Sequence, residues 1–210
     1  MTDFLESRFL RKMREVAPID DKTGLLLASH LEECRFAKKE MILRSGVFCH
    51  YAWLVEKGLV RHFWLEDGNE IVTSFSVEGH IVFSMDELYY GQPSQEYAQA
   101  ADPVEAWRIP LMDLERLFRE NLPLCNWGRL IHQNEYRRLH RSHKERLTLP
   151  ADARYELFRQ QFPDICTRAA LGDIASYLGI SPSTLSRIRK RYLGIFEEDV
   201  VFNPLIDYPG

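Results

Sequence analysis

Apolar residues near the start of the chain recur at the spacing of amphipathic helices. They predict one helix over residues 3–16 and a second over residues 20–32, and we assign both a packing role. Further helices are expected from Pro110 to about Asn121 and over residues 124–147. Helices are therefore expected on both sides of a central region that has a different pattern.

That central region, from about residue 34 to 109, is rich in Val, Ile, Phe and Trp in short runs. Glycines punctuate it at intervals of 12, 10 and 11 residues, at Gly46, Gly58, Gly68 and Gly79. Regular turn signals of this kind predict a compact antiparallel barrel or sandwich. Asp67-Gly68 is a typical two-residue hairpin turn. A β-sandwich of an unrelated family would show similar spacing, so the pattern alone does not choose between them.

Residues 171–191 predict two short helices joined by a tight turn. The first has an apolar face, and Gly179 follows where the chain needs a residue that tolerates positive φ. Ser181 is placed to cap a second helix, with Pro182 at its first position. The residues expected to be buried between the helices are Ile174, Ala175, Leu178, Leu185, Ile188 and Tyr192.

The opposite face of the second helix carries hydroxyls and basic side chains. Four basic residues fall within Arg187–Arg191, which suits a helix that enters the DNA major groove by its N-terminus. The alternative is an ordinary helical hairpin with a solvated basic face. The candidate DNA-binding residues are Ser181, Pro182, Ser183, Thr184, Ser186, Arg187, Lys190 and Arg191.

Charge is distributed unevenly along the chain, although the whole chain carries only −4. Residues 1–120 have 14 Lys and Arg against 21 Asp and Glu, whereas residues 121–192 have 13 against 6. Residues 193–210 carry four acids and no base. Electrostatic attraction to nucleic-acid phosphates is therefore expected only for residues 121–192.

The motif IASYLGIS followed by LSRIRK resembles the helix-turn-helix of the Crp/Fnr superfamily of transcription regulators. The resemblance implies an α+β fold: an N-terminal antiparallel β-roll of the cyclic-nucleotide-binding type, similar to a jelly roll, then a long connecting helix and a C-terminal helix-turn-helix. The implied domains are a sensor over residues 1–120, a connecting and dimerisation helix over 121–149, and a DNA-binding domain over 150–210. The β wing that usually follows the second helix is expected to be reduced or absent, because an acidic tail stands there.

The ligand cassette of the family is altered in this sequence. Relatives that bind cyclic nucleotides have Phe-Gly-Glu-Leu followed by Arg-x-Ala, and a phosphate is then held by the arginine. Here no Lys or Arg lies between Arg61 and Arg108, and Glu96 would repel a phosphate. Cyclic AMP is therefore not expected to bind, although an unknown small-molecule effector is not excluded. By resemblance, the candidate pocket residues are Phe83, Ser84, Asp86, Glu87, Ser94 and Gln95.

The long helix over residues 124–147 corresponds to the dimerisation helix of the family. Its first half offers an apolar seam for a homodimer, with Leu124, Trp127 and Ile131 as candidate contacts. Its second half is strongly polar, so a coiled coil along its whole length is not expected. The implied partners are double-stranded DNA with an inverted-repeat operator, a second copy of the chain, and RNA polymerase as a further candidate.

Several other functional classes are not favoured by the sequence. Four widely spaced cysteines and scattered histidines give no metal-ligand pattern, so no metal or cofactor is expected. No apolar run is long enough for a membrane span and no secretory signal is visible, which predicts a cytoplasmic protein. Enzyme motifs such as a phosphate-binding loop or HExxH are missing. The remaining alternative is a ligand-binding or protein-interaction module that does not contact DNA.

Overall fold

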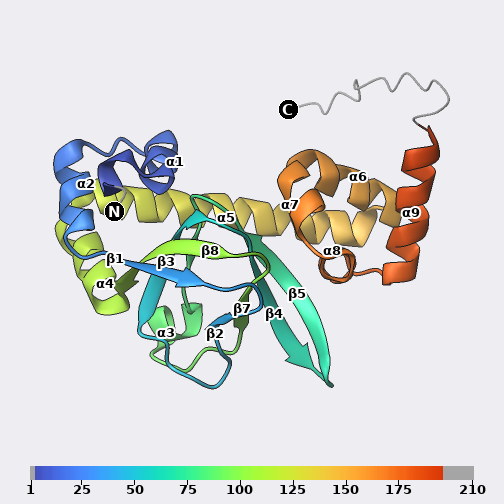
Figure 1. The fold of residues 1–210 in the computed structure, drawn as a ribbon, viewed down its shortest axis with the longest axis horizontal. Coiled ribbons are helices and arrows are strands. Elements are labelled where there is room, and N and C mark those ends of the chain that lie inside the picture. The colour runs from blue at the N-terminus through green and yellow to red at the C-terminus, as the bar shows by residue number, and fades with distance from the viewer. Residues whose placement is uncertain (1–2, 196–210) are drawn as a thin grey trace.

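The computed structural model describes residues 3–195 (Figure 1). Eight strands form the central body, which we call the roll (residues 32–110). Helices flank it on both sides in sequence, as the apolar pattern predicted. The strands are β1 (Glu32–Phe36), β2 (Met41–Leu43), β3 (Tyr51–Lys57), β4 (Val60–Glu66), β5 (Asn69–Ser76), β6 (Ile81–Val82), β7 (Tyr97–Ala100) and β8 (Val104–Pro110).

The strands of the roll form two four-stranded antiparallel sheets. One has the order β1-β8-β3-β6 and the other has the order β2-β7-β4-β5. Between them lies an apolar interior, which consists of Ile42, Leu43, Trp53, Val55, Val60, Val82, Ala98, Ala100, Val104 and Ala106. The predicted antiparallel β-roll is confirmed.

The turns of the roll occur where the glycines predicted them. The four glycines, Gly46, Gly58, Gly68 and Gly79, all have positive φ. Asp67 and Gly68 have φ of 50° and 77°, the combination that a tight hairpin turn with right-handed strand twist requires. At Gly58 an added Cβ would lie 2.7 Å from the Pro103 carbonyl oxygen, so only glycine fits there.

Helices at the start of the chain cover one side of the roll together with the helices that follow it. These are a 3₁₀ helix (Phe4–Glu6), α1 (Arg8–Val16), α2 (Asp21–Ala28), α4 (Leu111–Glu120) and α5 (Leu122–Thr148). Glu56 of β3 holds the first turn of α1, since its carboxylate accepts hydrogen bonds from the backbone N–H groups of Arg8 (2.7 Å) and Phe9 (2.9 Å). A negative charge at a helix N-terminus is stabilising there.

The long helix α5 runs from the N-terminal helices, past the roll, to a second group of helices at the other end of the molecule (Figure 1). This group, which we call the C-terminal helices, consists of α6 (Ala151–Gln161), α7 (Pro163–Arg168), α8 (Leu171–Leu178) and α9 (Pro182–Ile195). The helix α7 was not predicted. None of the described helices is long and apolar enough to cross a membrane. The predicted wing and acidic tail begin after residue 192. Residues 193–195 belong to α9, and the remaining residues of these predictions lie outside the described part of the chain.

Candidate functional site

The helices α8 and α9 form the predicted helix-turn-helix. α8 ends at Leu178 and is capped by Gly179, whose φ of 65° is left-handed, and the N–H of Ile180 donates to the carbonyl of Ala175 (3.0 Å). The hydroxyl of Ser181 accepts a hydrogen bond from the backbone N–H of Thr184 (3.1 Å), which is the expected cap of α9. Local sequence therefore sets both the end of one helix and the start of the next.

Apolar side chains fix α9 against α8, as predicted. Leu185 is 0% exposed and Ile188 is 2% exposed, and they join Ile174, Ala175 and Leu178 in one cluster. Tyr192 is partly buried and contacts the ring of Tyr155, with centroids 6.0 Å apart. The opposite face of α9 is therefore held at the surface by a rigid apolar core.

Most side chains predicted to contact DNA lie on that exposed face. The exposed ones are Ser181, Pro182, Ser183, Arg187, Lys190 and Arg191, whereas Thr184 and Ser186 are partly buried. Among the described residues, Arg187, Lys190 and Arg191 have no carboxylate partner within ion-pair distance. Three cations without internal counter-charges are available for an external anionic partner.

The six candidate pocket residues lie around a short helix, α3 (Met85–Tyr90), between β6 and β7. Glu87 accepts hydrogen bonds from the backbone N–H groups of Cys49 (2.8 Å) and His50 (2.9 Å). Burial works to raise the pKa of the Glu87 carboxyl, but these donors together lower it below its ordinary value. A carboxylate that already accepts hydrogen bonds from backbone groups of the same chain has few acceptor positions left for a ribose hydroxyl.

The other candidate pocket residues also bond within the chain. Ser84 caps α3 by accepting from the N–H of Glu87 (3.2 Å), and Asp86 accepts from the N–H of Gln95 (2.9 Å). The hydroxyl of Ser94, which is 2% exposed, donates to the carbonyl of Glu96 (2.9 Å). Phe83 contacts the rings of Tyr89 and His132, at 6.4 and 6.1 Å between centroids. The polar groups of these residues therefore form hydrogen bonds within the segment between β6 and β7.

Glu96 occupies a polar cluster with residues of β4 and β5. Its carboxylate accepts a hydrogen bond from the hydroxyl of Thr73 (2.5 Å) and lies 3.6 Å from Nδ1 of His62. Nε2 of His62 lies 2.9 Å from the hydroxyl of Ser76. Burial works to raise the pKa of the Glu96 carboxyl, and the contacts with His62 and Thr73 lower it. The charged form of the Glu96 carboxyl is therefore stabilised by its neighbours.

The predicted dimerisation residues lie in two different environments. Leu124 and Trp127 are 1% and 2% exposed and pack against α1 and α4 of the same chain. Their predicted contact with a second copy is therefore wrong, because their side chains are already enclosed. Ile131 is partly buried beside the same cluster. The apolar side chains of α5 that remain exposed are Leu122, Tyr136, Leu139 and Leu147.

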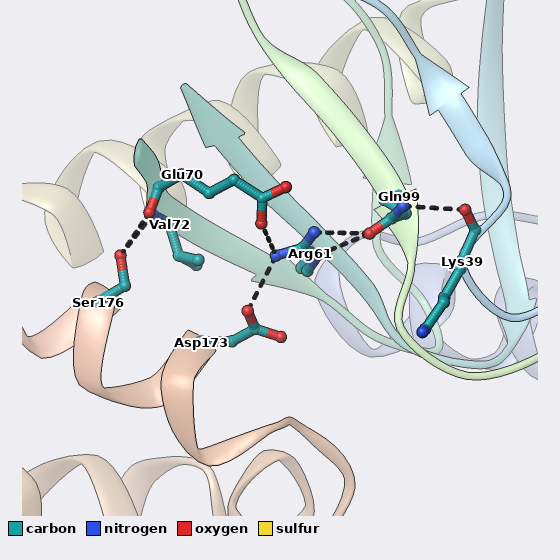
Figure 2. A network of polar contacts seen from close by, with 7 residues as sticks. All are labelled: Lys39, Arg61, Glu70, Val72, Gln99, Asp173 and Ser176. Carbon is teal, nitrogen blue, oxygen red and sulfur yellow. Dashed lines mark hydrogen bonds and ion pairs between the residues drawn. The ribbon is translucent and has the colours of Figure 1, made fainter. Parts of the chain in front are cut away.

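A polar network joins the roll to α8, and sequence analysis did not predict it (Figure 2). Nη1 of Arg61, on β4, donates to the carboxylates of Glu70 (2.6 Å) and Asp173 (2.9 Å). The guanidinium of Arg61 also donates to Oε1 of Gln99. The hydroxyl of Ser176 accepts from the N–H of Val72 (2.9 Å) and donates to the carbonyl of Glu70 (3.2 Å). Two strands thus hold one face of α8.

Two ion pairs of Arg168 and shared apolar contacts strengthen this junction. Arg168 of α7 contacts Asp102 (2.9 Å) and Glu78 (3.1 Å) of the roll. The ring of Phe75, on β5, lies 6.4 Å from that of Phe158 and 5.6 Å from that of Tyr177. The C-terminal helices therefore have a defined position on the outer face of β4 and β5.

Comparison with known proteins agrees with this architecture. Residues 33–121 match the family model described as the cyclic nucleotide-binding domain. No curated protein matches the chain. Among solved structures, FixK2 from Bradyrhizobium japonicum has a TM-score of 0.67 and 20% identity, covering 79% of this chain and 86% of that one.

Two further structures are described as regulators. The c-di-GMP-responsive global regulator CLP of Xanthomonas campestris has a TM-score of 0.65 and 18% identity, covering 84% of this chain and 93% of that one. A putative Crp/Fnr-family regulator from Eubacterium rectale ATCC 33656 has a TM-score of 0.65 and 17% identity, covering 84% of both chains. At such identities the likeness is one of fold. Residues 33–121 are therefore similar to the cyclic nucleotide-binding domain, and the chain shares its fold with solved regulators such as the putative Crp/Fnr-family protein.

Proposed function

We propose that this protein is a cytoplasmic, non-enzymatic transcription regulator that binds an inverted-repeat DNA operator as a homodimer. The observation that carries the proposal is the exposed basic face of α9, which is supported from behind by Leu185 and Ile188. A helix presented in this way suits insertion into the major groove. In this proposal residues 1–120 either sense an effector or only support the rest of the protein. Residues 121–149 connect this part to residues 150–210, which contact DNA.

The homodimer follows from the geometry of operators. Two helix-turn-helix units on one face of DNA must be about 34–36 Å apart, roughly one turn. Since Leu124 and Trp127 are enclosed, we propose that the partner contacts the side of α5 that carries Tyr136 and Leu139, with Ile131 at its edge. Light scattering of the purified protein tests this, and a monomer at working concentration would contradict it.

Arg187→Ala should weaken binding to the true operator by about 1–3 kcal/mol, with little effect on random DNA. Arginine can donate two hydrogen bonds to O6 and N7 of one guanine, and alanine removes both. Lys190→Ala should instead weaken binding to all sequences alike and reduce the slope of affinity against salt by about one unit, because it contacts phosphate. Gel shifts over a salt series measure both effects.

Lys190 is the matched control, because it is exposed on the same helix and carries the same charge. If Arg187→Ala lowered affinity equally for every sequence, Arg187 would be a phosphate contact. Absence of any salt-dependent DNA binding by the unmodified protein would contradict the proposed function itself, and would favour an interaction module.

Cyclic AMP should neither bind appreciably nor change DNA affinity. The loop has no arginine for the cyclic phosphate, which removes a charge-assisted hydrogen bond worth about 1.5–3 kcal/mol. Glu96 adds a partly buried negative charge near Thr73 and His62. Calorimetric titration of the full chain tests this, and micromolar affinity for cyclic AMP would refute it.

A further inference from the structure

A cleft whose lining includes four arginines lies where α5 meets α6 and α8. Its charged lining consists of four guanidiniums, Arg138, Arg141, Arg146 and Arg154, and one carboxylate, Glu145. Ser142, Gln161 and the hydroxyl of Tyr177 add neutral polar groups. None of the described side chains of α9 lines the cleft, so the cleft is separate from the face that we propose contacts DNA.

The arginines of this cleft are only partly neutralised within the described chain. Arg138 is paired with Glu135 (2.5 Å) and also donates to the hydroxyl of Tyr177 (3.0 Å). Arg141 and Arg146 are exposed, and among the described residues neither has an ion pair. Positive charges around one concave surface repel one another, and an anion bound between them offsets this repulsion.

Arg154 provides a second, independent observation. Its Nη1 donates to the carbonyl of Leu149 (3.1 Å) at the end of α5, which orients the guanidinium. Its Nε is fully buried and has no hydrogen-bond partner among the residues that the structure describes. A buried N–H of a charged group without an acceptor is rare, so the chain itself leaves the positive charge of this guanidinium incompletely compensated.

We propose that this cleft binds a phosphate group, either a free phosphate ion or the phosphate of a small phosphorylated molecule. Its enclosed part has a volume of about 20 Å³, which admits a single oxygen-sized group. The remaining oxygens would lie in the open mouth beside Arg141 and Arg146. Guanidiniums suit this ligand because each offers paired N–H donors to two phosphate oxygens.

An anion in this cleft would lie close to the turn of the helix-turn-helix. A Cβ at Gly179, in the turn between α8 and α9, would lie only 3.3 Å from Nη2 of Arg146, so this guanidinium lies against the turn. A phosphate bound by Arg146 and Arg154 would therefore join the end of α5 to α6 and to the turn. The proposal does not depend on DNA binding, and its test uses no DNA in the first step.

Calorimetry of the full chain at constant ionic strength tests the site, with inorganic phosphate, pyrophosphate and glycerol phosphate as probes. We expect saturable binding that weakens by about tenfold or more in the Arg141→Gln/Arg146→Gln variant, since two charge-assisted contacts are lost. The matched control is Arg119→Gln/Arg137→Gln, which removes the same charge from exposed positions of α4 and α5 outside the cleft. Thermal melting verifies that both variants fold.

The relative affinities identify the source of the phosphate. Tighter binding of glycerol phosphate indicates a phosphorylated molecule, and equal or tighter binding of inorganic phosphate indicates the free ion. No saturable binding, or equal losses in both double variants, would overturn the proposal. Loss of DNA affinity in the cleft variant without any phosphate binding would also overturn it, and would make the cleft a contact for the DNA backbone.

Discussion

Trp127→Ala is expected to lower the free energy of unfolding by about 3–5 kcal/mol, the usual cost of removing a fully buried aromatic side chain. Trp127 is 2% exposed, and its ring lies 5.9 Å from that of Phe9 and 6.2 Å from that of Phe118. The substitution would leave a cavity between α1, α4 and α5, which neighbouring helices could fill only in part. Urea unfolding followed by circular dichroism measures the loss.

The control for this substitution is Met112→Ala, on α4, because Met112 is apolar and 81% exposed. Its effect should stay within about 0.5 kcal/mol. The loss in Trp127→Ala should also be independent of protein concentration, since the side chain packs within its own chain. A loss of stability that grew on dilution would instead indicate that Trp127 contacts a second copy of the chain.

Leu185→Ala should lower the stability of the C-terminal helices by about 2–5 kcal/mol. Leu185 is 0% exposed, and it lies in the cluster that holds α9 against α8. Amide hydrogen exchange should show faster exchange in α8 and α9 than in the strands of the roll, because the cavity lies between those two helices. DNA affinity is expected to fall with it, since α9 would no longer be held rigidly.

Lys190→Ala is the control here, because it lies on the exposed side of the same helix. It should leave hydrogen exchange unchanged while still lowering DNA affinity. Uniform acceleration of exchange in both the roll and the C-terminal helices would contradict a local role for Leu185. Unchanged exchange in α8 and α9 would contradict its role in holding them together.

The helix-turn-helix could be predicted from sequence because its determinants are local. Gly179 allows the left-handed turn, and Ser181 with Pro182 starts the next helix within three residues. The roll was predictable for a similar reason, since Gly58 and Gly68 mark turns between strands that are adjacent in sequence. In each case the residue that determines the turn lies within a few residues of the helix or strand that begins or ends there.

Contacts over long sequence distances could not be predicted in this way. Arg61 and Asp173 are 112 residues apart, and neither position differs locally from an ordinary surface charge. The apolar stripe that contains Trp127 showed that one side of α5 is buried, but a stripe does not say whether the same chain or a second copy covers it. Pro163 gives no clear signal for α7, because a proline can mark the end of one helix and also suits the first turn of the next one.

The apolar cluster shared by the roll and the C-terminal helices has a consequence for folding. Phe63, Val72 and Phe75 of the roll belong to the same cluster as Phe158 and Leu178. Cutting the chain after α5 would leave an apolar surface on each fragment, and each would lose part of its stability and tend to aggregate. Each part therefore stabilises the other through this shared surface, although α8 and α9 can still open locally without the roll.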